Sequence, residues 1–447
     1  MSSAEKEQQE QVATSTIDAK ALIRRIDRRV LLLPFLLGLI SIIDRVNIGF
    51  AKASLSADLG LSATAYGFGA GVLFLGYFAL EVPSNHALRR FGARVWLTRI
   101  AVTWGIICSL TAFVTTDWQF YLARFLLGAA EAGLFPGVVL YLTYWYPAAW
   151  RGRAIGIFMA CIPAASIVGG PVAGWIMGLH EVAGLHDWQW LFLIEGLPAI
   201  VLGLLLVTLM HDRPEQVSWL SDKEKSWLAD QRRVEEAGEG MAGHVRGSLS
   251  AVLRSPTVWL FTLIYFCYAC GSYGLAFFLP AILKGFGAPS PAMVGLLTAI
   301  PYLVGAGAMT LVSRHADRTG ERRFHLAIPM AIGAIGLLGA GLTLQTPAVS
   351  YAFFIVAGIG LMSSVANFWA RPTRLLAGTA AASGIAIINS FGNIGGFVGP
   401  YAFGWTIDLS GGKNLAGLVF LAVVIVLGAV VAFAIRAGAR DLDEISG

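Results

Sequence analysis

The sequence predicts an all-α membrane protein with twelve transmembrane helices in two related six-helix halves, and three observations support this prediction. The chain of 447 residues is 56% hydrophobic and only 13% charged, whereas soluble domains carry about 25% charged residues. Apolar runs of about 20 residues, the length needed to cross a bilayer, recur throughout the chain. Motifs of the first six runs return in the last six.

The apolar runs that can span a membrane are twelve in number. The fourth, fifth and eleventh are longer than a bilayer requires, so we expect parts of them to tilt or protrude. The runs lie at residues 30–50, 64–84, 94–114, 118–146, 153–178, 190–210, 257–283, 291–312, 324–344, 348–370, 377–407 and 414–436.

The distribution of positive charge predicts that both termini are cytoplasmic. Lys and Arg gather in the N-terminal tail, in every second loop and at the C-terminus, whereas the alternate loops carry only Lys52, Lys284 and Lys413. Loops rich in these residues remain on the cytoplasmic side. We therefore expect a multi-pass protein of the cell membrane (inner or plasma membrane), and we read the net charge of +5 as this bias and not as nucleic-acid binding. The positive residues on the expected cytoplasmic side include Arg24, Arg28, Arg89, Arg151, Arg314, Arg374 and Arg440.

A long polar connection at the midpoint separates the two groups of spans. Ser221 and Glu224 have the spacing of a capping box, which predicts a helix start. Glycines that follow this helix indicate a flexible linker. We expect a cytoplasmic N-terminal tail at 1–29, an N-terminal six-helix half at 30–210, a central cytoplasmic loop at 211–256, a C-terminal six-helix half at 257–436 and a cytoplasmic C-terminal tail at 437–447.

Internal repeats relate the two halves. Span two ends in SNHALRRFGARVW and span eight in SRHADRTGERRF, while span five holds GGPVAGW and span eleven VGPYAFGW. Parallel repeats of this kind place the substrate site between the halves, near the membrane midplane.

Four ionisable residues lie inside apolar spans: Asp44 and Arg45 in span one, and Arg124 and Glu131 in span four. Each costs about 2.5–3.5 kcal/mol on insertion scales, so their presence asks for a function. Arg124 and Glu131 are two helical turns apart on one face, close enough to pair directly or through water. An alternative is a purely structural role in helix packing, which is strongest for Arg124 as a charge partner that only holds Glu131.

These four residues can couple a proton to an anion. When all four are ionised their charges cancel, and an incoming carboxylate adds negative charge to a space of low dielectric constant. Protonation of Asp44 or Glu131 frees an arginine to hold the carboxylate, so proton and anion favour each other's binding.

Several uncharged side chains at mid-span are candidates to contact the substrate. Tyr77 can hydrogen-bond a hydroxyl or carboxylate, with a packed ring as the alternative. Asn393 lies among glycines, where a ligand can approach the backbone closely. Because the N-terminal half holds all four buried charges, we expect coupling in that half and selectivity in the other. The remaining candidates are Asn47, Asn367 and Trp369.

Nothing in the sequence indicates an enzyme. We find no nucleophile–base set, no metal-ligand cluster and no cofactor motif, so we expect no catalytic residue, no bound metal and no cofactor. The four cysteines all lie in apolar segments. Cys267 and Cys270 have a C-x-x-C spacing, which we interpret as packing in preference to a redox or metal role.

Loop and span motifs together resemble one family. Asp317, Arg318 and Gly320 after span eight, echoed by Arg90-Phe-Gly92 after span two, resemble the loop motif of the major facilitator superfamily. The first copy departs from the superfamily pattern at Arg89 and Asn85, but PSN-x-x-x-RRFGAR is similar to the anion:cation symporter branch. So are RFLLGAAEAGLFPGVVLYLTYWYP with RGRAIG, IDRVNIGFA, DWQWLFLIEGLPAI and DRPEQVSWLSDKEKSWL.

The resemblance covers about residues 25–440 and is strongest to bacterial permeases for tartrate, phthalate and related acids. It implies the major facilitator fold and uptake of an organic anion (a hydroxy, dicarboxylic or aromatic acid such as tartrate or phthalate) with protons by alternating access. It implies that Asp44 and Glu131 accept the proton and that Arg45 contacts the substrate. Arg90, Asp317 and Arg318 are expected to gate by docking span ends in one state.

Three alternatives stay open at this point. They are proton symport of a hexonate or hexarate sugar acid, exchange of one anion for another, and a sensor that uses the same fold. In each case we expect the protein to bind a small organic anion and to lie in the lipid bilayer. Protons are a further partner if the protein is a symporter. We expect a monomer.

Overall fold

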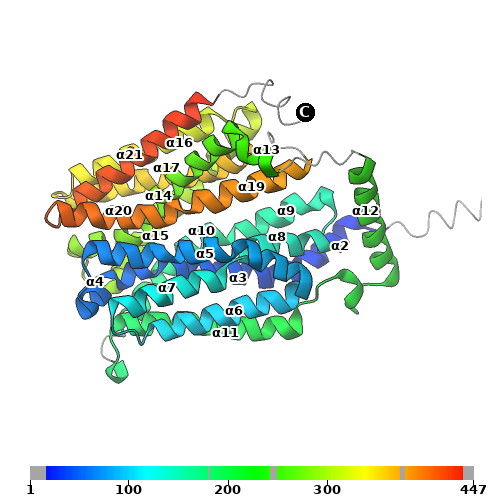
Figure 1. Cartoon of the computed structure of the whole chain (residues 1–447), viewed down its shortest axis with the longest axis horizontal. Helices are drawn as coiled ribbons and strands as arrows, with labels where there is room; N and C mark the ends of the chain where they lie inside the picture. The colour runs from blue at the N-terminus through cyan, green and yellow to red at the C-terminus, as the bar shows by residue number, and fades with distance from the viewer. Residues whose placement is uncertain (1–16, 180–181, 242–248, 373–377, 436–447) are drawn as a thin grey trace, which may run out of the picture.

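A computed structural model describes residues 17–179, 182–241, 249–372 and 378–435 as helices joined by short turns, with no strand among them (Figure 1). The expected C-terminal tail 437–447 and residues 1–16 of the N-terminal tail lie outside these residues, as do Arg374 and Arg440. Most helices run roughly parallel to one long axis of the molecule, which is the arrangement expected of a bundle that crosses a bilayer.

The N-terminal part of the chain builds the lower group of helices in Figure 1. The predicted spans one, four and five are each divided in two, by Asn47, by Ala132-Gly133 and by Ala160. The helices are α2 (Ala19–Ile26), the π-helix η1 (Asp27–Leu31), α3 (Leu32–Val46), α4 (Ile48–Leu59), α5 (Ala63–Phe91), α6 (Ala93–Thr111), α7 (Asp117–Glu131), α8 (Leu134–Trp145), α9 (Ala148–Met159), α10 (Cys161–Ile176) and α11 (Asp187–Leu209).

The C-terminal part builds the upper group. It comprises α14 (Pro256–Gly285), α15 (Pro291–Thr319), α16 (Phe324–Leu342), α17 (Pro347–Trp369), α19 (Gly378–Asn393), α20 (Gly395–Leu409) and α21 (Asn414–Ala434). Among the described residues, eleven helical stretches are long and apolar enough to cross a membrane. The predicted eleventh span is built from α19 and α20, which follow one another in line with only Ile394 between them.

A polar layer covers one end of the bundle. The central connection holds α12 (Asp222–Met241), which crosses that end in Figure 1, followed by the short α13 (Leu249–Arg254). The predicted capping box is confirmed, because the Ser221 amide donates to Glu224 Oε2 at 2.9 Å. Part of the predicted N-terminal tail is helical: from Ala19 it forms α2, whose Arg25 pairs with Glu224. Burial of one apolar face of α2 explains why this polar segment is helical; that face consists of Leu22, Ile23 and Ile26.

At the opposite end of the bundle, which we call the α4 end, the two groups touch directly. Gly67 of α5 packs on the Pro400 carbonyl, and Gly404 of α20 packs on the Ala63 carbonyl. A Cβ atom on Gly404 would lie 2.0 Å from that oxygen, so only glycine allows this approach. Asp408 of α20 also caps the start of α5, accepting from the Thr64 amide at 2.8 Å.

Candidate functional site

The four ionisable residues predicted from the sequence are all buried inside the N-terminal group. Asp44 and Arg45 on α3 are 1% and 6% exposed, and Arg124 and Glu131 on α7 are fully buried. We call these residues the charge cluster. Buried charges are stable only when they are paired or hydrogen-bonded, so their partners decide what the cluster can do.

The ion pair of the cluster joins α3 to α7. Arg45 Nη2 donates to Glu131 Oε2 at 2.7 Å. Ser41 Oγ lies 3.5 Å from the same carboxylate oxygen. Asp44, next to Arg45 in sequence, points elsewhere and accepts from the Trp104 indole nitrogen on α6 at 2.5 Å. The adjacent residues of α3 therefore serve two different neighbours, as their divergence of about 100° on a helix requires.

The expected pair between Arg124 and Glu131 is not formed. None of the three guanidinium nitrogens of Arg124 has a hydrogen-bond acceptor among the described residues. Glu131 Oε1 and Asp44 Oδ1 also lack a donor there. The physical reason is that Glu131 reaches across to α3, so that Arg124, two turns away on its own helix, is left without that carboxylate. The cluster therefore holds an unpaired buried guanidinium beside two carboxylates that can each take one more partner.

Glu131 is the last residue of α7, at a break in the predicted fourth span. Ala132 leaves the helical region with ψ 132°, and Gly133 has φ +86°. This left-handed conformation favours glycine. A Cβ on Gly133 would also lie 2.5 Å from Ser84 Oγ, and that hydroxyl donates to the Ala132 carbonyl. The turn at Ala132-Gly133 and the Ser84 hydroxyl together fix the direction in which the Glu131 side chain leaves α7.

Tyr77, a predicted substrate contact on α5, packs against the cluster. It is 5% exposed, and the Arg45 guanidinium carbon lies 5.2 Å from its ring centroid. Phe74, one turn earlier, holds the same guanidinium at 5.7 Å. The Phe74 ring contacts Tyr273 of α14 with centroids 4.5 Å apart. These rings connect the charge cluster of the N-terminal group to the C-terminal group.

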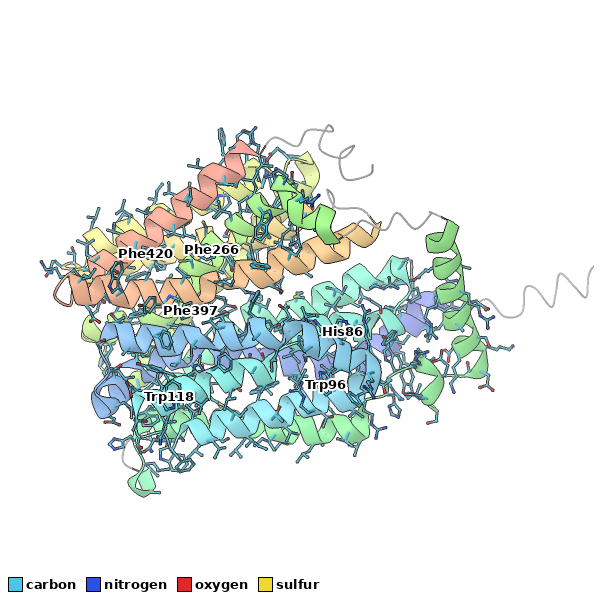
Figure 2. All side chains as sticks on the ribbon, viewed as in Figure 1. His86, Trp96, Trp118, Phe266, Phe397 and Phe420 are labelled. Atoms are coloured by element: carbon cyan, nitrogen blue, oxygen red, sulfur yellow. The ribbon has the colours of Figure 1, made fainter. Side chains whose placement is uncertain are left out.

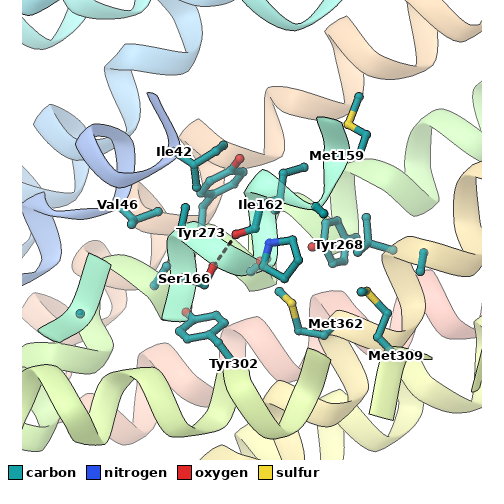
Figure 3. A pocket seen from close by; sticks show the side chains of 18 of the residues that line it. Ile42, Val46, Met159, Ile162, Ser166, Tyr268, Tyr273, Tyr302, Met309 and Met362 are labelled. Carbon is teal, nitrogen blue, oxygen red and sulfur yellow. Dashed lines mark hydrogen bonds between the residues drawn. The ribbon is translucent and has the colours of Figure 1, made fainter. Parts of the chain in front are cut away.

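A cavity of about 410 Å³ lies between the two groups (Figure 3). It is lined from α3, α4, α9 and α10 on one side and from α14, α15 and α17 on the other. Ile42 and Val46, which flank Arg45 on α3, belong to the lining, and so does the predicted residue Trp369. A volume of this size is typical of small-molecule sites. The cavity is therefore the candidate substrate chamber, with the charge cluster behind its α3 wall.

Asn393 lies in a polar bridge between the two groups and not among the cavity-lining residues. Its amide nitrogen donates to Asn389 Oδ1 at 3.3 Å. Asn389 and Ser390 of α19 in turn donate to Glu81 of α5, at 3.0 and 2.6 Å. Glu81 is only 5% exposed. The bridge joins α5 of the N-terminal group to α19 of the C-terminal group.

Asn47 and Asn367 are buried but stand apart from the cavity lining. Asn47 is at the α3–α4 junction, and its amide faces the buried carboxylate of Glu195 on α11. Asn367 donates to the Ser363 carbonyl at 2.9 Å and accepts from Arg322 at 3.3 Å. Asn367 therefore contacts the turn between α15 and α16, and it does not line the cavity as Trp369 does.

The predicted gating residues are exposed and do not meet across the two groups in this structure. Asp317 pairs with Arg322 of its own connection, while Arg318 is exposed on α15. Arg90 lies over the neighbouring Phe91 ring at 5.5 Å. Gly92 and Gly320 end α5 and α15 with positive φ values of +85° and +69°, but their ψ values of 158° and −3° differ, so the two copies of the loop motif turn differently. His86 and Trp96 mark this end of the bundle in Figure 2, and Trp118 marks the α4 end.

Sequence reasoning missed several residues of the site. Glu81 and Glu195 lie inside predicted spans two and six, and both are only 5% exposed. Their acidic character inside apolar runs was a usable signal. The tyrosines of the cavity gave none, because aromatic residues are common in packed helices. These are Tyr265, Tyr268, Tyr273 and Tyr302.

No group of three or more His, Cys, Asp or Glu residues that could hold a metal is found in the part of the chain that the structure describes. The four cysteines are free and buried. Cys267 and Cys270 sit on α14, packed against Gly428 and Gly399 respectively. Their surroundings fit the interpretation as packing residues.

Comparisons with known proteins identify relatives. The model of the Major Facilitator Superfamily matches residues 34–400 and 263–441. Two proteins of Agrobacterium vitis, both named "Putative tartrate transporter", are 43% and 44% identical to this chain. The first alignment covers 94% of this chain and 92% of the relative, the second 92% and 93%. The inward open structure of the xylose transporter XylE from E. coli is 17% identical, with a TM-score of 0.75 over 93% of this chain and 98% of that one.

Proposed function

Because the chain belongs to the major facilitator superfamily, whose members are transporters and not enzymes, we propose that this secondary transporter of organic acids takes up its anion together with protons. The observation that carries the proposal is the buried charge cluster beside the cavity. Arg45 is held by Glu131, and Arg124 is left without an acceptor among the described residues. Such a cluster can take up a proton together with a substrate carboxylate without changing its net charge.

The proposed coupling has two steps. A proton on Glu131 weakens the ion pair at 2.7 Å and frees Arg45. The freed guanidinium then binds the substrate carboxylate at the α3 wall of the cavity, where Tyr77 packs beside it. Proton and anion thus bind cooperatively, and each raises the affinity for the other by the same factor. Asp44, held by Trp104, is the second proton acceptor of the proposal.

Transport requires the cavity to open alternately to the two sides of the membrane. The two groups of helices rock against each other, so the close contacts at the α4 end form in one state and separate in the other. The exposed residues Arg90, Asp317 and Arg318 are proposed to dock at the opposite end in that other state. The positive charge of that end supports its assignment to the cytoplasm of an inner membrane.

The proposal is tested with purified protein in liposomes. An imposed pH gradient, acidic on the substrate side, is expected to drive accumulation of an organic anion, and addition of the anion is expected to dissipate the gradient. Exchange of internal for external anion without proton movement would replace symport by antiport. Binding without any accumulation would indicate a sensor with this fold.

Gly404 offers a test of the alternating contacts. Replacing Gly404 by alanine places a Cβ 2.0 Å from the Ala63 carbonyl, but only in the state in which the α4 end is closed. We expect the equilibrium to shift toward the open α4 end and the transport rate to fall roughly tenfold, the effect of about 1.4 kcal/mol. Spin labels on the exposed residues Ala57 and Lys413 are expected to move apart.

The control for this prediction is Gly336→Ala. Its Cβ would lie 2.3 Å from the Ala357 amide, at a contact of α16 with α17 inside one group. This variant is expected to lower thermal stability without changing the distance between the two labels. An unaltered distance in the Gly404 variant would contradict the rocking of α20 against α5.

A further inference from the structure

A buried carboxylate that does not belong to the charge cluster joins the two groups of helices. Glu81 of α5 is 5% exposed. Its Oε1 accepts from the Asn389 amide nitrogen at 3.0 Å and its Oε2 from the Ser390 hydroxyl at 2.6 Å, and both donors lie on α19 of the C-terminal group. We call this contact the Glu81 bridge. An ionisable residue inside an apolar span is costly, so its presence asks for a function beyond packing.

The Glu81 bridge lies on the cytoplasmic side of the charge cluster in the orientation proposed above. Tyr77, one helical turn before Glu81 on α5, packs on the Arg45 guanidinium. Glu81 then lies about 15 Å before α5 ends at Phe91. Of the hydrogen bonds described between α5 and the C-terminal group, those of Glu81 lie furthest from the α4 end. The two groups must separate at this depth before the cavity opens fully to the cytoplasm.

The donors of the bridge fit a carboxylate better than a carboxylic acid. Asn389 Oδ1 accepts from the Asn393 amide nitrogen at 3.3 Å, so the Asn389 amide presents its nitrogen to Glu81. Glu81 therefore meets a donor at each oxygen, whereas a carboxylic acid needs an acceptor at one of them. A proton on Glu81 also removes its charge from both hydrogen bonds, and charge-assisted hydrogen bonds are about twice as strong as neutral ones.

The charges around Glu81 couple its proton to the position of α19. Among the described residues, Arg45 is the cation within electrostatic reach of Glu81, and Tyr77 is the other titratable side chain that faces it. The α19 sequence holds no ionisable residue. The ionised form of Glu81 thus depends on the two uncharged donors of α19, which it loses when the groups separate. Because binding effects are reciprocal, a proton on Glu81 favours that separation.

We propose that Glu81 is a further proton-binding carboxylate of this carrier, and that a proton on it releases α5 from α19 on the cytoplasmic side. This inference rests on the proton-coupled transport proposed above and adds a residue to it. The charge cluster binds the proton that travels with the anion, and the Glu81 bridge makes opening of the cytoplasmic side depend on a further proton.

The distance between the two groups on that side tests the proposal. Spin labels replace Arg89, exposed near the end of α5, and Arg254, exposed on α13, which contacts α19. In the purified full chain, the fraction of molecules with separated labels is expected to rise as the pH falls from neutral to acid. Glu81→Gln is expected to make that fraction independent of pH, whereas Glu131→Gln is expected to keep the response. A Glu81 variant with the full pH response would overturn the proposal.

Asn389→Asp provides a test of opposite sign, because it keeps the shape of the side chain and replaces a donor by a second carboxylate. Two ionised carboxylates repel each other, whereas in acid the pair shares a proton. The labels are therefore expected to be separated at neutral pH and to approach each other as the pH falls. A response in the same direction as that of the unaltered protein would contradict proton binding at the bridge.

Ser390→Ala removes one donor and leaves the carboxylate in place. The equilibrium at neutral pH is expected to shift roughly tenfold toward separation, the value of one hydrogen bond to a charged group. Ser350→Ala is the matched control, because this buried hydroxyl donates to the Ala340 carbonyl at 2.8 Å within the C-terminal group. It should leave the label distance unchanged. Equal shifts in both serine variants would indicate a general loosening of the fold and overturn the assignment.

Accumulation in liposomes separates this inference from the function on which it rests. Proton-driven accumulation by the unaltered protein, together with a label distance that does not depend on pH, leaves the proposed function standing and overturns the role of Glu81. A pH response that Glu81→Gln abolishes, in a protein that accumulates no anion, overturns the proposed function and keeps Glu81 as a proton-binding contact between the groups.

Discussion

Replacement of Glu131 by glutamine is expected to abolish proton-driven accumulation, bringing the internal-to-external ratio of the anion to about 1, its value without coupling. Glutamine keeps the shape of the side chain and an oxygen that can accept from Arg45, now 2.7 Å away. It carries no exchangeable carboxyl proton, so it mimics the protonated state permanently. Counterflow of labelled against unlabelled anion, which moves no net proton, is expected to survive in part.

The measurement is accumulation of labelled anion in liposomes under a fixed pH gradient, with counterflow measured in the same preparation. Glu235→Gln is the matched control, because this carboxylate pairs with Arg151 at 2.8 Å and lies outside the charge cluster. It should leave both activities intact. Full accumulation by the Glu131 variant would eliminate Glu131 as the proton acceptor and leave Asp44 as the remaining candidate of the cluster.

The existence of the charge cluster could be predicted from the sequence, but its pairing could not. A carboxylate or guanidinium in an apolar run is visible because burial of a charge is costly. Which partner it finds depends on how each helix is rotated and on where it breaks. Spacing within span four suggested Arg124 for Glu131, whereas the bond is made to Arg45, 86 positions earlier in the chain. The break at Gly133 reorients Glu131, and only the tertiary structure reveals it.

The apolar runs that form the helices could likewise be predicted from the sequence. Whether each run forms one continuous helix or two was harder to predict. Each of the three spans that looked too long is built from two helices, which meet at Ala132-Gly133, at Ala160 and at Ile394. Excess length was therefore a real signal of a break. The first span gave no such signal, since Asn47 interrupts a run of ordinary length. An amide inside an apolar run is compatible with an unbroken helix as well.

The sequence predicts proton coupling in the N-terminal half and substrate selectivity in the C-terminal half, and the residues that line the cavity bear on this prediction. All four residues of the charge cluster lie on α3 and α7, while all four cavity tyrosines lie on α14 and α15. Sequence alone indicated the first set by its charge. It could not indicate the second, because a tyrosine facing a cavity and one packed in a core look the same along the chain. Contact across the interface, as between Phe74 and Tyr273 at 4.5 Å, is what links the two sets.

Replacement of Arg45 by lysine is expected to raise the Kd for the anion roughly ten- to hundredfold, the loss of a charge-assisted hydrogen bond. Lysine keeps the positive charge but lacks the planar fork that can hold two carboxylate oxygens at once, or Glu131 and the substrate in turn. The ammonium would also lose the stacking of the guanidinium over Tyr77, now at 5.2 Å. Calorimetric titration of the purified variant measures the effect, with Arg99→Lys, outside the cluster on α6, as the control. An unchanged affinity would place the carboxylate elsewhere, and Arg124, buried without an acceptor among the described residues, would then be the guanidinium to test next.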